Sequence, residues 1–180
     1  MTTDTQSIYM DRGSGSEPFT VKGVNLGVGL PGEWATDYAI DRETYLRWFG
    51  QMQDTCASTQ GVYIPLPDDL IYAFSDYNTL REENGEEPLW LIHGVWVNDY
   101  VQNSHRDAYD KDFLDAFIED GRTLVDGLHG NKKISLGRGT GSGFYNKDVS
   151  RWVIGYILGV EWEDVTVDYT GHKYHDLPPY

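Results

Sequence analysis

The chain has 180 residues, with 14 basic and 29 acidic side chains and a formal net charge of −15. This acidic balance argues against a nucleic-acid partner and against docking to anionic lipid, because both need a basic surface. No apolar stretch approaches the roughly 20 residues that cross a bilayer, and the first residues lack the basic and apolar regions of a signal peptide. We therefore expect a cytoplasmic chain with no membrane segment.

Composition divides the chain into two parts. Residues 1–18 are polar and rich in glycine and serine, which predicts a disordered tail. Hydrophobic residues make up 39% of the chain, enough for one folded β/α domain over residues 19–180.

Short apolar runs alternate with helical patterns along that domain. The predicted strands are 20–28, 61–66, 89–97 and 153–160, and the predicted helices are 42–56, 70–83 and 113–128. Aspartates are expected to cap these helices at Asp41, at Asp68 or Asp69, and at Asp110. Residues 130–143 are expected to form a long loop, and the segment after Trp162 shows no helical period.

Strands that alternate with helices predict a parallel sheet with helices packed on it. Two α/β architectures remain open. Parallel β/α units could form the first half of a (β/α)8 TIM barrel, or they could form an open doubly wound parallel sheet. The length of 180 residues favours the open sheet, because a complete barrel needs about 250 residues.

In both architectures functional residues gather where parallel strands end. The polar or aromatic residues at the predicted ends are Asn25, Tyr63, His93 and Glu161. Neither a dinucleotide-binding glycine motif nor a P-loop is present, so no cofactor is expected.

A histidine pair near the carboxyl end is the nearest approach to a metal site. His172, His175 and Asp176 are loosely spaced in a segment without a predicted element, so we interpret them as a chance surface cluster and expect no metal site.

Glu161 stands out because it follows an apolar strand and precedes Trp162. A carboxyl group at the end of a strand, beside an apolar tryptophan ring, is partly shielded from water. Such shielding favours its protonated form, which a general acid needs. The alternative is a structural glutamate at a strand end. Trp34, Trp96 and Trp162 are expected at the same edge of the sheet, where they could stack on sugar rings or pack in the core.

The runs FTVKGVNLG, VYIPLP, PLWLIHGVWV and WVIGYILGVEW, in this order, resemble the N-terminal half of the TIM barrels of clan A glycoside hydrolases of the family-two and family-five type. The resemblance extends from Phe19 to about Thr170. It implies a retaining glycosidase or transglycosylase that acts on an oligo- or polysaccharide, with Glu161 as the general acid/base. The substrate-binding residues that it implies are Asn25, Trp34, Tyr63, His93, Trp96 and Trp162.

The sequence departs from this pattern at two positions. Val160 stands where the resemblance implies an asparagine, and Gly61 stands where it implies an arginine that supports the nucleophile. The nucleophile of this clan follows strand seven, so we expect it outside this chain or lost.

A retaining mechanism needs a second carboxylate about 5–5.5 Å from the first. The candidates within the chain are Glu33, Asp37 and Asp99. Two further possibilities are open: self-association or a second half-barrel completes the site, or the chain is a noncatalytic carbohydrate-binding remnant of such an enzyme.

Overall fold

The computed structural model describes residues 1–4, 6–11, 13–33, 40–63, 67–97, 107–134 and 142–177. The strands are β1 (Thr2–Thr3), β2 (Ile8–Asp11), β3 (Ser16–Phe19), β4 (Gly23–Asn25), β5 (Thr59–Val62), β6 (Trp90–Trp96), β7 (Lys132–Ile134), β8 (Gly143–Tyr145) and β9 (Val153–Val160). The helices are α1 (Arg42–Asp54), α2 (Asp68–Glu83), α3 (Lys111–Leu128) and α4 (Asp164–Lys173), and a 3-10 helix covers Ser150–Trp152. None of the described helices combines the length and the apolar character needed to cross a membrane.

Strands β4, β5, β6 and β9 form one parallel sheet in that order, which is also their order in the chain. Each connection therefore adds the next strand on the same side of the sheet. A doubly wound sheet reverses its direction of growth at a switch point, and the described strands of this sheet show no such reversal. The predicted parallel α/β architecture is confirmed.

The predicted element bounds differ from the observed ones mainly around the first two strands. The predicted strand 20–28 is shortened to Gly23–Asn25, and β5 begins at Thr59, two residues before its predicted start. Residues 64–66 of the same prediction lie outside the described residues. The fourth strand, Val153–Val160, has the predicted bounds.

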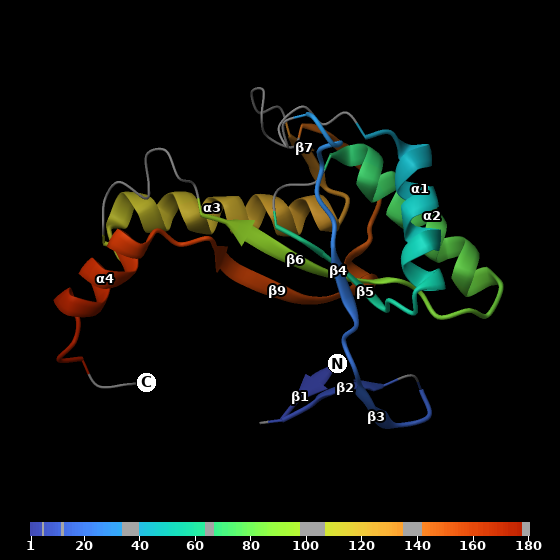
Figure 1. Ribbon diagram of the computed structural model, residues 1–180, viewed down its shortest axis with the longest axis horizontal. Coiled ribbons are helices and arrows are strands. Elements are labelled where there is room, and N and C mark those ends of the chain that lie inside the picture. Colours follow the sequence, from blue (N-terminus) through green and yellow to red (C-terminus); the bar gives the residue numbers. More distant parts are fainter. Residues whose placement is uncertain are drawn as a thin grey trace.

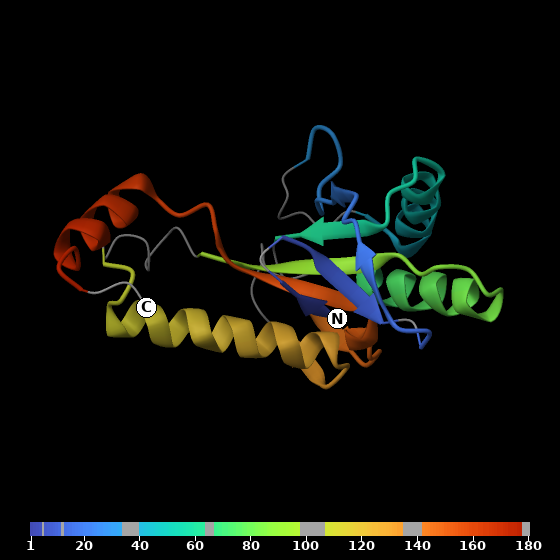
Figure 2. The same cartoon turned by 90° about the horizontal axis from the view of Figure 1, so that it is seen from below.

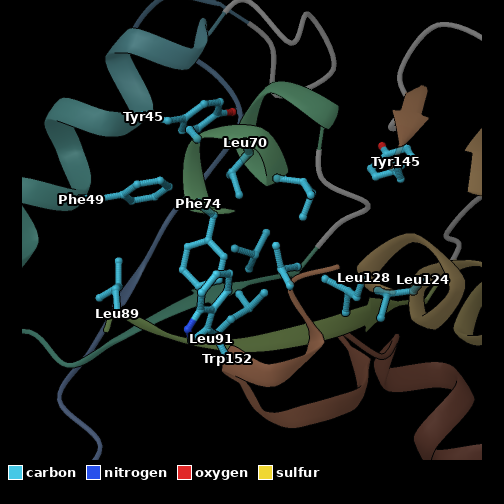
Figure 3. Packing of buried hydrophobic residues seen from close by; sticks show 14 of the residues in the cluster. Tyr45, Phe49, Leu70, Phe74, Leu89, Leu91, Leu124, Leu128, Tyr145 and Trp152 are labelled. Atoms are coloured by element: carbon cyan, nitrogen blue, oxygen red, sulfur yellow. The ribbon is translucent and has the colours of Figure 1, made fainter. Parts of the chain in front are cut away.

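One hydrophobic core joins the sheet to three helices. Figure 1 shows α1, α2 and α3 on the same side of the parallel sheet. On β6 the alternate residues Leu91 and Val95 belong to the same buried cluster as residues of α1, α2 and α3. Figure 3 shows this packing for Tyr45, Phe49, Leu70, Phe74, Leu89, Leu91, Leu124, Leu128, Tyr145 and Trp152. Because the cluster is continuous, the three helices cover the same face of the sheet. The view in Figure 2 shows α3 running alongside β6 and β9.

Aspartate side chains fix the start of two helices, as predicted. Asp41 accepts a hydrogen bond from the Thr44 amide at 2.8 Å, and Asp110 accepts from the amides of the first turn of α3. The predicted cap at Asp68 or Asp69 is wrong, because both residues lie in the first turn of α2, whose N-cap is Pro67 without a side-chain cap. The Asp68 carboxylate accepts from the adjacent Asp69 amide and from the Phe144 amide, each at 3.1 Å, and the second bond ties α2 to β8.

The amino-terminal segment is an antiparallel sheet of β1, β2 and β3 and differs from the predicted disordered tail. Between β2 and β3, Gly13 and Gly15 have φ values of 88° and 123°, which glycine adopts without steric cost. Gly13, Ser14 and Gly15, which suggested a tail, therefore lie in the connection of a hairpin. The Phe19 ring packs edge-on against Trp90 at a centroid distance of 6.4 Å, at the first residue of β6.

Two further segments contain elements that periodicity did not predict. β7, inside the predicted loop 130–143, pairs with β8. Residues after Trp162 form α4, which buries Thr166 and is held by polar contacts of Lys173 and Tyr174 with Asp107. A helix fixed through polar contacts near its end has no apolar stripe for a 3.6-residue period to detect.

Strand β9 is an edge of the parallel sheet as described, and its middle is apolar and exposed. Tyr156, Ile157 and Leu158 are 43%, 39% and 72% exposed. An edge strand offers unpaired backbone groups to another strand, and exposed apolar side chains favour its burial.

We expect Phe74→Ala to lower the free energy of unfolding by about 3–5 kcal/mol, because it empties a fully buried ring position. Its ring lies 5.8 Å from the centroids of both Phe49 and Trp152. Urea unfolding followed by circular dichroism measures the loss. Phe144→Ala is the matched control, because the Phe144 ring is 54% exposed and should change stability by less than about 0.5 kcal/mol. Equal losses would contradict this core.

We expect the chain to associate as its concentration rises, and added salt to promote this, because a charge of −15 repels like chains. Light scattering measures the mass. Ile157→Lys on β9 should weaken association, whereas Leu80→Lys on the exposed side of α2 should not. A chain that stays monomeric at high concentration and high salt contradicts the expectation.

Candidate functional site

The two faces of the parallel sheet differ in what covers them. Leu91, His93 and Val95 of β6 face the helices, so the alternate residues Gly94 and Trp96 face the other way. We call the face opposite to α1, α2 and α3 the open face. Its carboxyl edge is where the strand ends of the predicted site lie.

Asn25 lies on the open face at the end of β4. It is paired in register with Gly61 of β5, and the Leu26 amide donates to the Gly61 carbonyl at 2.9 Å. The Asn25 side-chain oxygen lies 2.7 Å from the point that a Cβ on Gly61 would occupy. The side-chain amide of the exposed Asn25 therefore extends from β4, the edge strand, over Gly61 of β5.

Tyr63 lies one strand further along the same face. A Cβ on Gly94 would be 3.1 Å from Tyr63 Cα, 3.3 Å from Tyr63 Cδ1 and 3.1 Å from Val160 Cγ2. The half-buried Tyr63 thus lies over the glycine of β6, next to Val160 of β9. Trp96, also half-buried, is the register partner of Val160.

Three predicted site residues are thus brought to one face and one edge. Neighbouring strands are about 4.8 Å apart. Asn25 is level with Gly61 and Ile92, so Trp96, four residues beyond Ile92, lies about 10 Å across the sheet and about 13 Å along the strands from Asn25. An amide, a phenol and an indole along this edge offer hydrogen bonds and flat apolar rings to a ligand.

Glu161 follows β9 directly, as predicted, and its side chain is exposed. Its φ is 57°, a left-handed value that costs a non-glycine residue about 1–2 kcal/mol. Gly159 is also left-handed with φ 80°, and the pairing with β6 shifts register at this point. These features turn the chain out of the sheet at Glu161.

Trp162 does not join the open face. Its ring lies 5.4 Å from the Phe113 centroid and 6.1 Å from the Phe117 centroid, so it packs against α3. A Cβ on Gly159 would overlap its indole, which shows that the ring folds back over the strand end. The apolar wall predicted beside Glu161 is instead a contact between β9 and α3.

His93 also lies away from the open face. It is 2% exposed, and its Nδ1 lies 2.8 Å from the Gly94 carbonyl oxygen. It borders a cavity of about 20 Å³ between the sheet, α2 and α3, room for about one water molecule. Burial lowers the pKa of His93 to about 4, so the ring is neutral near pH 7. The structure therefore separates His93 from Asn25 and Tyr63.

The remaining candidates are placed only in part. Trp34, Asp37 and Asp99 lie outside the described residues. Glu33 is exposed in a turn, where its amide donates to the Leu30 carbonyl at 3.0 Å.

The residues that the structure describes contain no group of three or more histidine, cysteine or acidic side chains that could hold a metal ion. His172 and His175 are exposed, and they pair separately with Asp168 and Asp176.

Gly94 is the residue of the candidate site that sequence reasoning missed. A glycine in the middle of an apolar strand signals a close approach of another group. That signal was present in the run LWLIHGVWV, but the neighbour that approaches could not be known from one strand.

Comparisons of the chain with protein-family models, with curated proteins and with solved structures gave no match. The likeness to clan A barrels therefore rests on the quoted sequence runs alone.

We expect stability to fall as the pH decreases from 6.5 to 4, by about 3 kcal/mol from His93 alone. Over this range the unfolded chain binds a proton at His93 that the folded chain excludes, so acid favours unfolding. Urea unfolding at several pH values measures this for the wild type and for His93→Asn. Carboxylates titrate in both proteins, so the difference between the two profiles reports His93. Parallel profiles for wild type and His93→Asn would contradict the assignment.

Proposed function

We propose that this chain is a glycoside hydrolase-like, carbohydrate-active protein whose open face binds an oligo- or polysaccharide at its carboxyl edge. The observation that carries the proposal is the placement of Asn25, Tyr63 and Trp96 on one face at the edge where Glu161 ends the last strand. Sugars present hydroxyl groups around a ring with apolar faces, and this set offers hydrogen bonds together with flat rings.

The strand order supports a barrel-type arrangement. Four parallel strands in chain order, with three helices on one face, are also found in the first half of a (β/α)8 barrel. In such a barrel the open face would line the interior, and its carboxyl edge would be the mouth that holds the active site.

Glu161 is the proposed general acid/base. In a retaining mechanism it would protonate the leaving glycosidic oxygen and then deprotonate the water that releases the sugar. The nucleophile would be a second carboxylate about 5–5.5 Å away. Within the described part of the parallel sheet, Glu161 is the one acidic residue that directly follows a strand. The nucleophile would therefore come from another segment or from a second half-barrel.

A noncatalytic carbohydrate-binding protein is the second candidate. The observation that favours it is the same lack of a second strand-end carboxylate among the described residues. Binding needs only the amide and ring groups of the open face.

Turnover of aryl β-glycosides by the wild type, Glu161→Gln and Glu163→Gln separates the enzyme from the binding protein. We expect Glu161→Gln to lower turnover by about 10²–10⁴-fold, because an amide cannot transfer the proton. Glu163→Gln, at an exposed position two residues later, should keep wild-type turnover. Wild-type turnover in Glu161→Gln contradicts the proposed acid/base role.

Calorimetry with neutral gluco- and manno-oligosaccharides tests the binding candidate in parallel. Tyr63→Ala should weaken binding by about tenfold through the lost ring contact. Tyr109→Ala, at a ring that is 61% exposed, should not change the affinity. No binding and no turnover by the wild type would contradict both candidates.

A further inference from the structure

Gly61 is the residue over which the Asn25 amide lies. A Cβ at Gly61 would be 2.7 Å from Asn25 Oδ1 and 3.8 Å from Asn25 Cγ. Real Cβ atoms essentially never approach a neighbour to 2.7 Å, so a larger residue at position 61 would force the amide to move. The free space above Gly61 therefore sets where the Asn25 side chain can lie.

This space matters because of where Asn25 starts. All three residues of β4 are exposed, and β4 is an edge of the parallel sheet as described. By leaning across Gly61, the amide reaches the second strand, on the face that carries Tyr63. If the Asn25 side chain did not extend over Gly61, its amide would lie beside the sheet edge, further from the Tyr63 ring.

The groups that share this surface are uncharged. On the open face of β4, β5 and β6, the described carboxyl-edge residues are Asn25, Gly61, Tyr63, Gly94 and Trp96. An amide both donates and accepts hydrogen bonds and so matches a hydroxyl group. A chain with a net charge of −15 also repels anionic ligands.

We infer that Gly61 is a positioning residue, which holds the Asn25 amide over β5 to bind a hydroxyl group of a neutral sugar. The inference rests on the proposed function and deepens it, because it specifies an uncharged saccharide and the residue that fixes its hydrogen-bonding partner.

A double-mutant cycle tests the inference with Asn25→Ala, Gly61→Ala and the double variant. The atom that an alanine at position 61 would meet is the end of a flexible side chain, so the variant should fold with a wild-type melting temperature. Gly155→Ala is the matched control on the same face of the same sheet, because its Cβ would lie an ordinary 3.9 Å from Ile92 Cγ1.

Affinity for neutral gluco- and manno-oligosaccharides is the first measurement. We expect Asn25→Ala and Gly61→Ala each to weaken saccharide binding by about tenfold. The double variant should bind as tightly as Asn25→Ala does, because both changes remove the same contact. Gly155→Ala should have the wild-type affinity. Wild-type affinity in Gly61→Ala, beside a loss in Asn25→Ala, overturns the inference. Full additivity of the two losses in binding free energy also overturns it. So does tighter binding of an oligogalacturonate, an anionic saccharide, than of the neutral oligosaccharides.

The side-chain amide signal of Asn25 in a ¹H–¹⁵N spectrum of the free protein gives a second readout that needs no ligand. It should shift in Gly61→Ala and stay in place in Gly155→Ala, and an unmoved signal in Gly61→Ala overturns the positioning role. A wild type that binds no saccharide while this signal shifts overturns the proposed function and the sugar assignment. These two failures are therefore distinguishable.

Discussion

The packing of α1, α2 and α3 against one face of the parallel sheet is the constraint on which the other features depend. Phe74 lies at its centre, between the rings of Phe49 and Trp152, and Leu91 brings β6 into the same cluster. Since apolar burial is the main favourable term in folding, these contacts decide which face of each strand is committed to the core. Every side chain at an alternate position is then directed to the open face.

This one-sided commitment separates residues that neighbour each other in the sequence. His93 and Gly94 are adjacent, yet the imidazole enters the helix layer while Gly94 underlies Tyr63 on the open face. Glu161 and Trp162 are adjacent as well, but the carboxylate is exposed and the indole packs against α3. A candidate site read from strand ends alone therefore mixes residues from both faces.

The open face has a protected end and an exposed end. Phe19 of the amino-terminal sheet packs on Trp90, where β6 begins, whereas Asn25 is exposed where β4 ends. Under the proposed function, the amide and the aromatic rings of the exposed edge would bind the hydroxyl groups and the apolar ring faces of an uncharged sugar. The acidic surface of the chain acts in the same direction by repelling anions.

Local patterns were sufficient wherever a segment buries an apolar stripe. The sequence alone determined the alternation of strands and helices, the caps at Asp41 and Asp110, the bounds of β9, and the position of Glu161 directly after that strand. Periodicity failed for α4, whose end is held by Lys173 and Asp107, because a polar contact leaves no repeating signal. It also failed for the amino-terminal hairpin, because a glycine-rich composition occurs in tight turns as well as in disordered tails.

Only the tertiary structure decided the order of the strands, the face on which each predicted site residue lies, and the approach of Asn25 to Gly61. These features depend on contacts between residues far apart in the chain, such as the 36 positions from Asn25 to Gly61. A single sequence reports what each segment prefers by itself. The partner across the sheet is selected by the packing of the whole core, and no segment carries that information alone.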